Sequence, residues 1–222
     1  MIKKRKIDHL QEEITKADIL VEALPYMQAY RDKTVLIKFG GSAMDDPELV
    51  MRDIVVMEAM GLNPVVVHGG GKAITKAMAE AGLEAKFING LRVTTKEAIN
   101  IVEDTLSAHI NPGLVEMMRA AGGKAVGIPG TNVFVGEKLR ERDAEGRPVD
   151  IGMVGHVISC LVSRVEEALS LQLTPVISPL ARELGTNQSL NVNADLAAAA
   201  LAKALKVRKF ALVSAVPGLL KD

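Results

Sequence analysis

The chain has 222 residues, of which 48% are hydrophobic, and its 27 Lys and Arg residues balance its 27 Asp and Glu residues. This length allows one substantial α/β domain or two small ones, and the apolar content argues against a disordered chain. The balanced charge excludes a global field that would attract nucleic acid or an anionic membrane. The single cysteine, Cys160, excludes an internal disulfide and is compatible with a reducing compartment.

The N-terminal residues predict a helix and no targeting signal. Acidic residues interrupt the basic start, no apolar run follows it, and nowhere do 18 apolar residues follow one another. We therefore expect a soluble, cytoplasmic protein. Residues 8–30 place apolar side chains at helical spacing with Pro25 inside the pattern, which predicts a helix that is kinked or broken just before that proline.

Two strand–loop–helix units come next. The run TVLIKF at 34–39 is typical of a strand buried on both faces, and residues 45–61 predict a helix with an aspartate cap and a proline in its first turn. The run NPVVVH at 63–68 predicts a second strand, followed by a glycine turn and a helix that ends at Gly82. This alternation predicts a parallel sheet with crossover helices.

The rest of the chain continues the α/β pattern with one excursion. We expect a helical stretch over about 95–121, interrupted near Pro112, and antiparallel hairpin strands within 132–158. The remaining elements are a strand in GKAVGIPG, a helix in SRVEEALSLQ, a strand in TPVIS, a loop RELGTNQS, a helix in NADLAAAALAKALK and a strand in KFALVSA. The predicted fold class is α/β, a mostly parallel open sheet sandwiched by helices, with an extra N-terminal helix and a β-hairpin excursion.

Glycine-rich loops follow the first two predicted strands, in KFGGS and HGGGK. In open parallel sheets, ligands lie beyond the carboxyl ends of the strands, where loops meet helix N-termini. Glycine lets the backbone approach a ligand, so that consecutive N–H groups can converge on phosphate oxygens, and Lys38 adds a mobile positive charge. The alternative is that both loops are only tight strand-to-helix turns.

The second glycine loop matches neither of two familiar phosphate motifs. Val66 stands where the first glycine of a P-loop belongs, and Ala73 stands where Ser or Thr would reach magnesium. Three adjacent glycines also lack the G-x-G-x-x-G spacing of dinucleotide sites. The sequence therefore gives no support for a P-loop or for a nicotinamide cofactor.

Other polar residues are candidates for ligand contacts. Arg92, in NGLRVT, could hold a carboxylate through two parallel hydrogen bonds, or it could be a solvated surface arginine. Asn191, Asn193 and Asp195 alternate along the chain, so they could face one site, or they could be ordinary helix caps.

The histidines and the cysteine offer weaker signals. The four histidines show no metal-ligand spacing, and His68 is adjacent to the triple glycine, so structural or solvated roles are favoured. We expect Cys160 to be a core residue. We predict no dedicated protein metal site.

Taken together, five segments resemble the amino-acid-kinase family. They are IKFGGSAM, VVVHGGGKAI, NGLRVT, IGMVGHV and LNVNADLAAAALA, in the family's order and approximate spacing over about 35–222. The resemblance implies a carbamate-kinase-like fold. It also implies transfer of the γ-phosphoryl group of ATP to the γ-carboxylate of N-acetyl-L-glutamate, the second step of arginine biosynthesis, with Mg²⁺ held mainly by nucleotide phosphates.

The resemblance assigns the phosphoryl-transfer roles to four residues. Lys38 would neutralise the charge that spreads over the transferred group, and Asp195 would orient the catalytic lysines. Gly40 and Gly41 would offer backbone N–H groups to the phosphate.

The resemblance assigns substrate binding to Gly69, Gly70, Arg92 and Asn191. Arg92 would bind a substrate carboxylate, and Asn191 would hydrogen-bond the acetylated amino acid. The glycines would bring backbone amides close to the reacting groups.

The resemblance also implies a domain arrangement. Residues 1–30 would be an oligomerisation helix, like those that interlace and join three dimers into a hexamer in arginine-inhibited members. Residues 31–190 would form the acetylglutamate-binding lobe, and 191–222 would begin the nucleotide-binding lobe. Because the family's nucleotide lobe extends beyond the position of Asp222, we expect this chain to be truncated there.

Four positions depart from the family pattern and keep two alternatives open. Ala215 replaces Asp or Asn near the nucleotide, Pro129 and Thr131 replace a Ser-Gly-Lys-Asp type of loop, and His156 replaces Glu. One alternative is a non-catalytic module that binds an acidic ligand or serves assembly. The other is a related kinase that acts on another acid.

Overall fold

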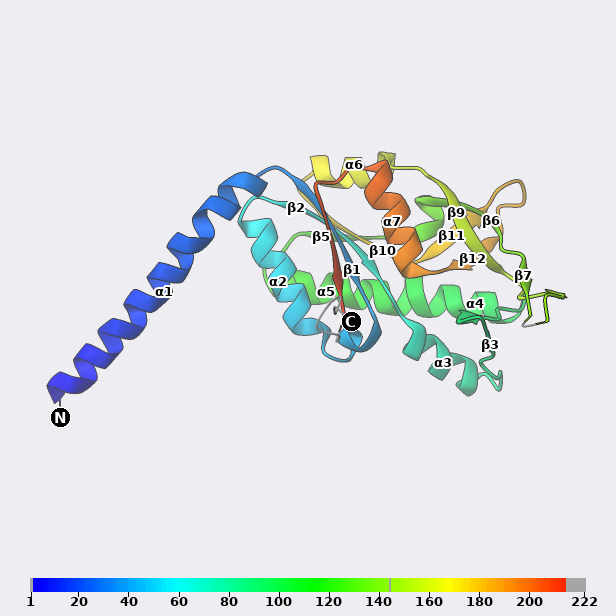
Figure 1. Cartoon of the computed structure of the whole chain (residues 1–222), viewed down its shortest axis with the longest axis horizontal. Helices are drawn as coiled ribbons and strands as arrows, with labels where there is room; N and C mark the ends of the chain where they lie inside the picture. Colours follow the sequence, from blue (N-terminus) through cyan, green and yellow to red (C-terminus); the bar gives the residue numbers. More distant parts are fainter. Residues whose placement is uncertain (1, 144, 215–222) are drawn as a thin grey trace.

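The computed structural model describes residues 2–143 and 145–214. Helix α1 (Ile2–Tyr30) projects away from the rest of the molecule as one rod (Figure 1). It runs through Pro25 without ending there, so of the expected kink or break, the break is wrong. Proline removes its own N–H bond to the carbonyl of Val21 and crowds that carbonyl, yet the helix continues to Tyr30.

A five-stranded parallel sheet forms the centre of the fold. Its order is β13–β1–β2–β10–β5, and each described pairing is parallel, as the α/β pattern predicts. Its strands are β1 (Thr34–Phe39), β2 (Asn63–His68), β5 (Ala125–Ile128), β10 (Thr174–Ile177) and β13 (Lys209–Val213). The first two match the predicted strands residue for residue.

Helices cover both faces of this sheet (Figure 1). Alternate strand residues point to opposite faces: Val35 and Ile37 pack with α2 and α5, whereas Leu36 packs with the helices of the other face. The helices are α2 (Pro47–Ala59), α3 (Gly71–Glu80), α4 (Ala98–Glu103), α5 (Asn111–Ala120), α6 (Ser163–Ser170) and α7 (Ala194–Ala204). Among the described residues, no helix is both long and apolar enough to span a bilayer.

The long helical stretch is continuous rather than interrupted at Pro112. A π-helical segment, η2 (Asp104–Ile110), joins α4 to α5, and Pro112 lies in the first turn of α5. There the amide of Asn111 donates to the carbonyl of Leu106. The wider turn accommodates the proline without ending the helix, and such segments are frequent at functional sites.

A second sheet closes into a small barrel of four strands in the order β11–β12–β9–β6. The strands are β6 (Phe134–Lys138), β9 (Val154–Cys160), β11 (Leu180–Glu183) and β12 (Ser189–Val192). The antiparallel β6–β9 pair confirms the predicted excursion. Residues 184–188 of the expected loop RELGTNQS form the turn of the β11–β12 hairpin, and only its ends lie in strands. Those two strands were not predicted, because pairing with β6 and β9 stabilises strands too short to recognise in isolation.

Short elements complete the fold. They are the hairpin strands β3 (Phe87–Ile88) and β4 (Leu91–Arg92), the hairpin strands β7 (Glu141–Arg142) and β8 (Pro148–Val149), and the 3₁₀ helices η1 (Gly41–Asp45) and η3 (Gly130–Asn132). The lobe boundary expected at residue 190 falls inside β12, and α7 shares a core cluster with residues on both sides of it.

Candidate functional site

A cavity of about 670 Å³ opens at the carboxyl ends of β1 and β2. Both glycine loops, the first turn of α3, the β3–β4 hairpin and the junction of β12 with α7 line it. This is the edge of a parallel sheet where ligands bind. The structure therefore brings together the segments that the sequence singled out separately.

Lys38 and Asp195 meet in this cavity. Lys38 lies near the end of β1, and Asp195 lies in the first turn of α7. The ammonium of Lys38 is 2.9 Å from an oxygen of the Asp195 carboxylate. The carboxylate therefore fixes the direction in which the lysine points.

The two glycine loops pack against each other. A Cβ added to Gly69 would lie 3.2 Å from the Cα of Gly40, and one added to Gly40 would lie 2.9 Å from the Lys38 ammonium. Their amides differ from the expectation, because Gly40 donates to the carbonyl of Val213 and Gly69 to that of Phe39. At these two positions the missing side chain is what allows the loops to approach each other.

Helix α3 begins at the second loop with an open N-terminus. Gly70 is its N-cap and provides no side-chain hydrogen bond. Gly70 and Gly71 line the cavity, as does Gly41 of the first loop. Because the first N–H groups of a helix have no intrahelical partner, this end is suited to an anion.

An ion pair that the sequence did not indicate joins the two loops. Lys72, in the first turn of α3, is 2.5 Å from the carboxylate of Asp45, in η1. Both residues are exposed at the cavity wall. Asp45 and Lys72 lie 27 residues apart along the chain, a spacing that matches no known motif, so the sequence alone does not predict this pair.

Arg92 is buried rather than a solvated surface residue, at 8% exposure. Its Nη2 donates to the carbonyl of Gly71 at 2.9 Å and to the hydroxyl of Thr75 at 2.7 Å, and its guanidinium lies 4.7 Å from the centre of the Phe87 ring. Burial lowers the pKa of Arg92. The guanidinium is therefore held between α3 and Phe87 in the wall of the cavity.

Thr94 connects Arg92 to Asn191. The Asn191 amide donates to the Thr94 hydroxyl at 3.1 Å, and that fully buried hydroxyl donates to the carbonyl of Arg92 at 2.9 Å. Asn193 follows the cap alternative instead, because its side-chain oxygen accepts from the amides of Asp195 and Leu196. Sequence spacing did not reveal Thr94, whose role depends on contacts across the fold.

The histidine next to the glycine loop is structural. His68 is completely buried, and its Nδ1 lies 2.8 Å from the carbonyl of Gly69 while the amide of Asn111 lies 3.2 Å from Nε2. Burial lowers the pKa of His68 to about 4, against the opposing effect of the Gly69 hydrogen bond. The ring is therefore neutral at pH 7, with Nδ1 donating and Nε2 accepting.

The other expectations concern Cys160 and the departures from the family pattern. Cys160 is partly buried against the core, and burial raises its pKa to about 11. Neither Thr131 nor His156 lines the cavity, and Ala215 lies outside the described residues. Within the described chain, no group of three or more His, Cys, Asp or Glu side chains is arranged to hold a metal ion.

Two known proteins are similar to this chain over most of its length. The chain is 68% identical over 212 residues to the acetylglutamate kinase of Akkermansia muciniphila, covering 94% of this chain and 71% of that protein. It is 42% identical over 226 residues to the acetylglutamate kinase of Caldanaerobacter subterraneus, covering 100% of this chain and 73% of that protein.

A solved structure and a family model complete the comparison. The crystal structure of smu.665 from Streptococcus mutans UA159 matches with a TM-score of 0.73 at 31% identity, covering 85% of this chain and 75% of that one. Residues 33–222 match the model of the amino acid kinase family. The chain therefore belongs to the amino acid kinase family.

Proposed function

We propose that this kinase transfers the γ-phosphoryl group of ATP to the γ-carboxylate of N-acetyl-L-glutamate, a step of arginine biosynthesis. The observation that carries the proposal is the Lys38–Asp195 ion pair beside the two packed glycine loops, in a cavity that Arg92 and Asn191 also line. The names of the two acetylglutamate kinases support the same substrate.

The acceptor half of the cavity suits an acetylated amino acid with two carboxylates. Arg92 offers a cation beside the aromatic ring of Phe87. Because the amide nitrogen of Asn191 is used by Thr94, its oxygen remains as an acceptor for the N–H of an acetamido group. The γ-carboxylate is already ionised at pH 7, so the reaction needs no general base to activate it.

The donor half suits transferred phosphate. Negative charge spreads over the equatorial oxygens as the group moves, so the protein contributes positioning and electrostatic stabilisation. The Lys38 ammonium and the open N-terminus of α3 both line the cavity and supply the positive potential that this charge requires. The cavity lining contains three cationic and two acidic side chains, a net charge of +1 when all are ionised.

A magnesium ion fits this site as part of the nucleotide. Mg²⁺ in kinases commonly uses one or two carboxylates together with phosphate oxygens and water. The two cavity carboxylates, Asp45 and Asp195, each pair with a lysine. We therefore assign the ion mainly to the phosphate oxygens of ATP, where it neutralises charge.

The proposal includes assembly through α1. Leu10, Ile14, Val21 and Leu24 are exposed and follow one another at steps of four, seven and three residues, which places them on one face of the helix. A second copy of the helix can cover such a stripe, as in a coiled coil. We propose that the protein forms dimers, which α1 joins into hexamers. We also propose that it is cytoplasmic, since a single cysteine is compatible with a reducing compartment.

Calorimetry and an activity assay test the proposal. The chain is titrated with N-acetyl-L-glutamate and, separately, with a non-hydrolysable ATP analogue and Mg²⁺. We expect both to bind, and ADP release from ATP to require the acid.

The same measurements separate the alternatives. Binding of the acid without the nucleotide would support a non-catalytic binding module. Preference for an acid one methylene longer than N-acetyl-L-glutamate would support a related kinase. Binding of neither ligand would overturn the proposal.

A further inference from the structure

The β3–β4 hairpin forms one wall of the cavity, although it is very small. Each strand has two residues, and the turn between them is Asn89-Gly90, with φ of 49° and 77°. Asn-Gly favours such a turn, but an isolated two-stranded hairpin is only marginally stable in water. The hairpin carries Phe87 and Arg92 as cross-strand partners. Because so short a hairpin is not stable alone, contacts with the rest of the fold must hold these two residues in place.

Main-chain bonds hold the base of the hairpin. Thr94 donates from its amide to the carbonyl of Ile151 and accepts from the amide of Met153. This contact joins the strand that leaves the hairpin to the segment between β8 and β9. The tip of the hairpin, Asn89-Gly90, lies four to five residues before Thr94. Neither of these two main-chain bonds reaches it.

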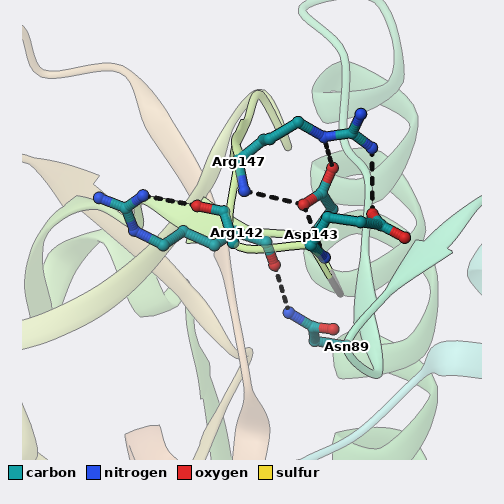
Figure 2. A network of polar contacts seen from close by, with 6 residues as sticks. Asn89, Arg142, Asp143 and Arg147 are labelled. Carbon is teal, nitrogen blue, oxygen red and sulfur yellow. Dashed lines mark hydrogen bonds and ion pairs between the residues drawn. The ribbon is translucent and has the colours of Figure 1, made fainter.

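The side chain of Asn89 anchors the tip. Its amide nitrogen donates at 2.8 Å to the Glu141 carboxylate and at 3.0 Å to the carbonyl of Arg142. Figure 2 shows the amide of Asn89 directed at Arg142, across the gap between the two hairpins. Both hydrogens of the amide are therefore engaged by the β7–β8 hairpin.

The accepting hairpin is itself braced by hydrogen bonds (Figure 2). The Asp143 carboxylate accepts from the amides of Glu145 and Arg147 and from Nε of Arg147 at 2.7 Å. Arg142 donates from Nη1 to the carbonyl of Gly146 at 2.6 Å. The carbonyl that Asn89 uses thus belongs to Arg142, whose own side chain and neighbour Asp143 are held by these bonds.

We infer that Asn89 is a positioning residue for the acid substrate. Its side chain fastens the β3–β4 hairpin, which carries Phe87 and Arg92, to the β7–β8 hairpin. Released from this clamp, the hairpin tip samples other positions, and the half-exposed ring of Phe87 leaves the guanidinium of Arg92 for part of the time. The inference rests on the proposed function for its substrate, although the clamp itself can be measured without any ligand.

Asn89→Gly tests the clamp while preserving the turn, because glycine accepts a positive φ. Two hydrogen bonds are lost, so we expect the Kd for N-acetyl-L-glutamate to rise about tenfold, with the Kd for the ATP analogue unchanged. Asn187→Gly is the matched control, since Asn187 has φ of 59° in the β11–β12 turn and does not line the cavity. We expect this control to bind the acid like the wild type.

Glu141→Gln provides the conservative counterpart. It keeps an oxygen that can accept from Asn89, so we expect the acid's Kd to stay within about twofold of the wild type. An unchanged Kd in Asn89→Gly, or an equal loss in Asn187→Gly, would overturn the positioning role.

Amide hydrogen exchange separates failure of the clamp from failure of the proposed function. We expect residues 87–93 to exchange faster in Asn89→Gly than in the wild type or in Asn187→Gly, with no ligand present. If the wild type does not bind the acid, the proposed function fails and exchange alone decides on the clamp. Equal exchange in all three proteins would overturn it.

Discussion

Lys38 and Asp195 form an ion pair of 2.9 Å in which the lysine side chain is 13% exposed and the aspartate side chain 54% exposed. The carboxylate thus turns the ammonium of a nearly buried lysine toward the cavity. The packed glycine loops leave room for it, since a Cβ on Gly40 would lie 2.9 Å from the nitrogen. This arrangement presents one fixed positive charge where two strands of the parallel sheet end.

Removing that charge should slow phosphoryl transfer. We expect Lys38→Met to lower kcat by about 100-fold, the scale of losing one electrostatic donor, while the Kd for the acid changes little. The control is Lys33→Met, which removes an exposed lysine directly before the first residue of β1, at the end of the strand away from the cavity. Steady-state kinetics check this, and near-normal turnover by Lys38→Met would refute the assignment.

Arg92→Lys should weaken binding of the acid. Lysine keeps the charge, but it cannot reproduce the planar fork that contacts Gly71, Thr75 and Phe87. We expect the KM for N-acetyl-L-glutamate to rise about tenfold or more, with the KM for ATP unchanged. Arg164→Lys on α6 is the matched exposed control, and an unchanged KM for the acid in Arg92→Lys would count against the role.

Much of the fold follows from short-range patterns. TVLIKF and NPVVVH are continuous apolar runs between polar or glycine-rich segments, so their strands could be predicted residue for residue. Pro25 and Pro112 misled the prediction because a proline's local effect depends on whether neighbouring hydrogen bonds can carry the helix past it. Strands β11 and β12 were missed because pairing with other strands decides their conformation.

The site shows the same division. Lys38, the glycine loops, Arg92 and Asp195 could be proposed because parallel strands end at a common edge, and a family resemblance links the motifs. Thr94, Lys72 and Asn89 could not, because each acts through a residue far away in the sequence. Only the folded chain reveals those contacts.

Buried His68 should make the protein less stable in acid. Its pKa falls from 6.5 to about 4 on folding, so between these values the unfolded chain binds more protons than the folded one. Stability is therefore lost as the pH falls from about 6.5 toward 4, by about 2 kcal/mol between pH 7 and pH 5. Urea denaturation at several pH values measures this.

The matched variants for this effect are His68→Gln and His156→Gln. The first removes the buried titrating group and should flatten the loss below pH 6.5. The second changes an exposed histidine on β9 and should keep the wild-type dependence. Parallel pH profiles for the wild type and His68→Gln would contradict the assignment.

Gly152 should tolerate alanine poorly. It has φ of 75°, and a Cβ there would collide with the carbonyl of Thr94, which is fixed by its bond to Met153. Gly122, with φ of 88° and open space around it, is the control for backbone strain alone.

The difference between these two variants isolates the collision. We expect Gly122→Ala to lower the free energy of unfolding by about 1 kcal/mol and Gly152→Ala by about 3 kcal/mol. Gly152→Ala should also weaken acid binding, because Thr94 connects Arg92 to Asn191. Equal losses of stability would show that Thr94 yields to the new methyl group.

The apolar stripe of α1 gives the assembly proposal a sharp test. Removing residues 1–30 should convert hexamers into dimers, measured by light scattering after size exclusion. The double variant Ile14→Glu and Val21→Glu should do the same, because it places charges on the face that a second helix would cover. Ile19→Glu is the matched control: Ile19 is 61% exposed but lies on the opposite side of the helix from Leu10. Hexamers that survive the double variant, or that Ile19→Glu disrupts equally, would contradict a specific helix seam.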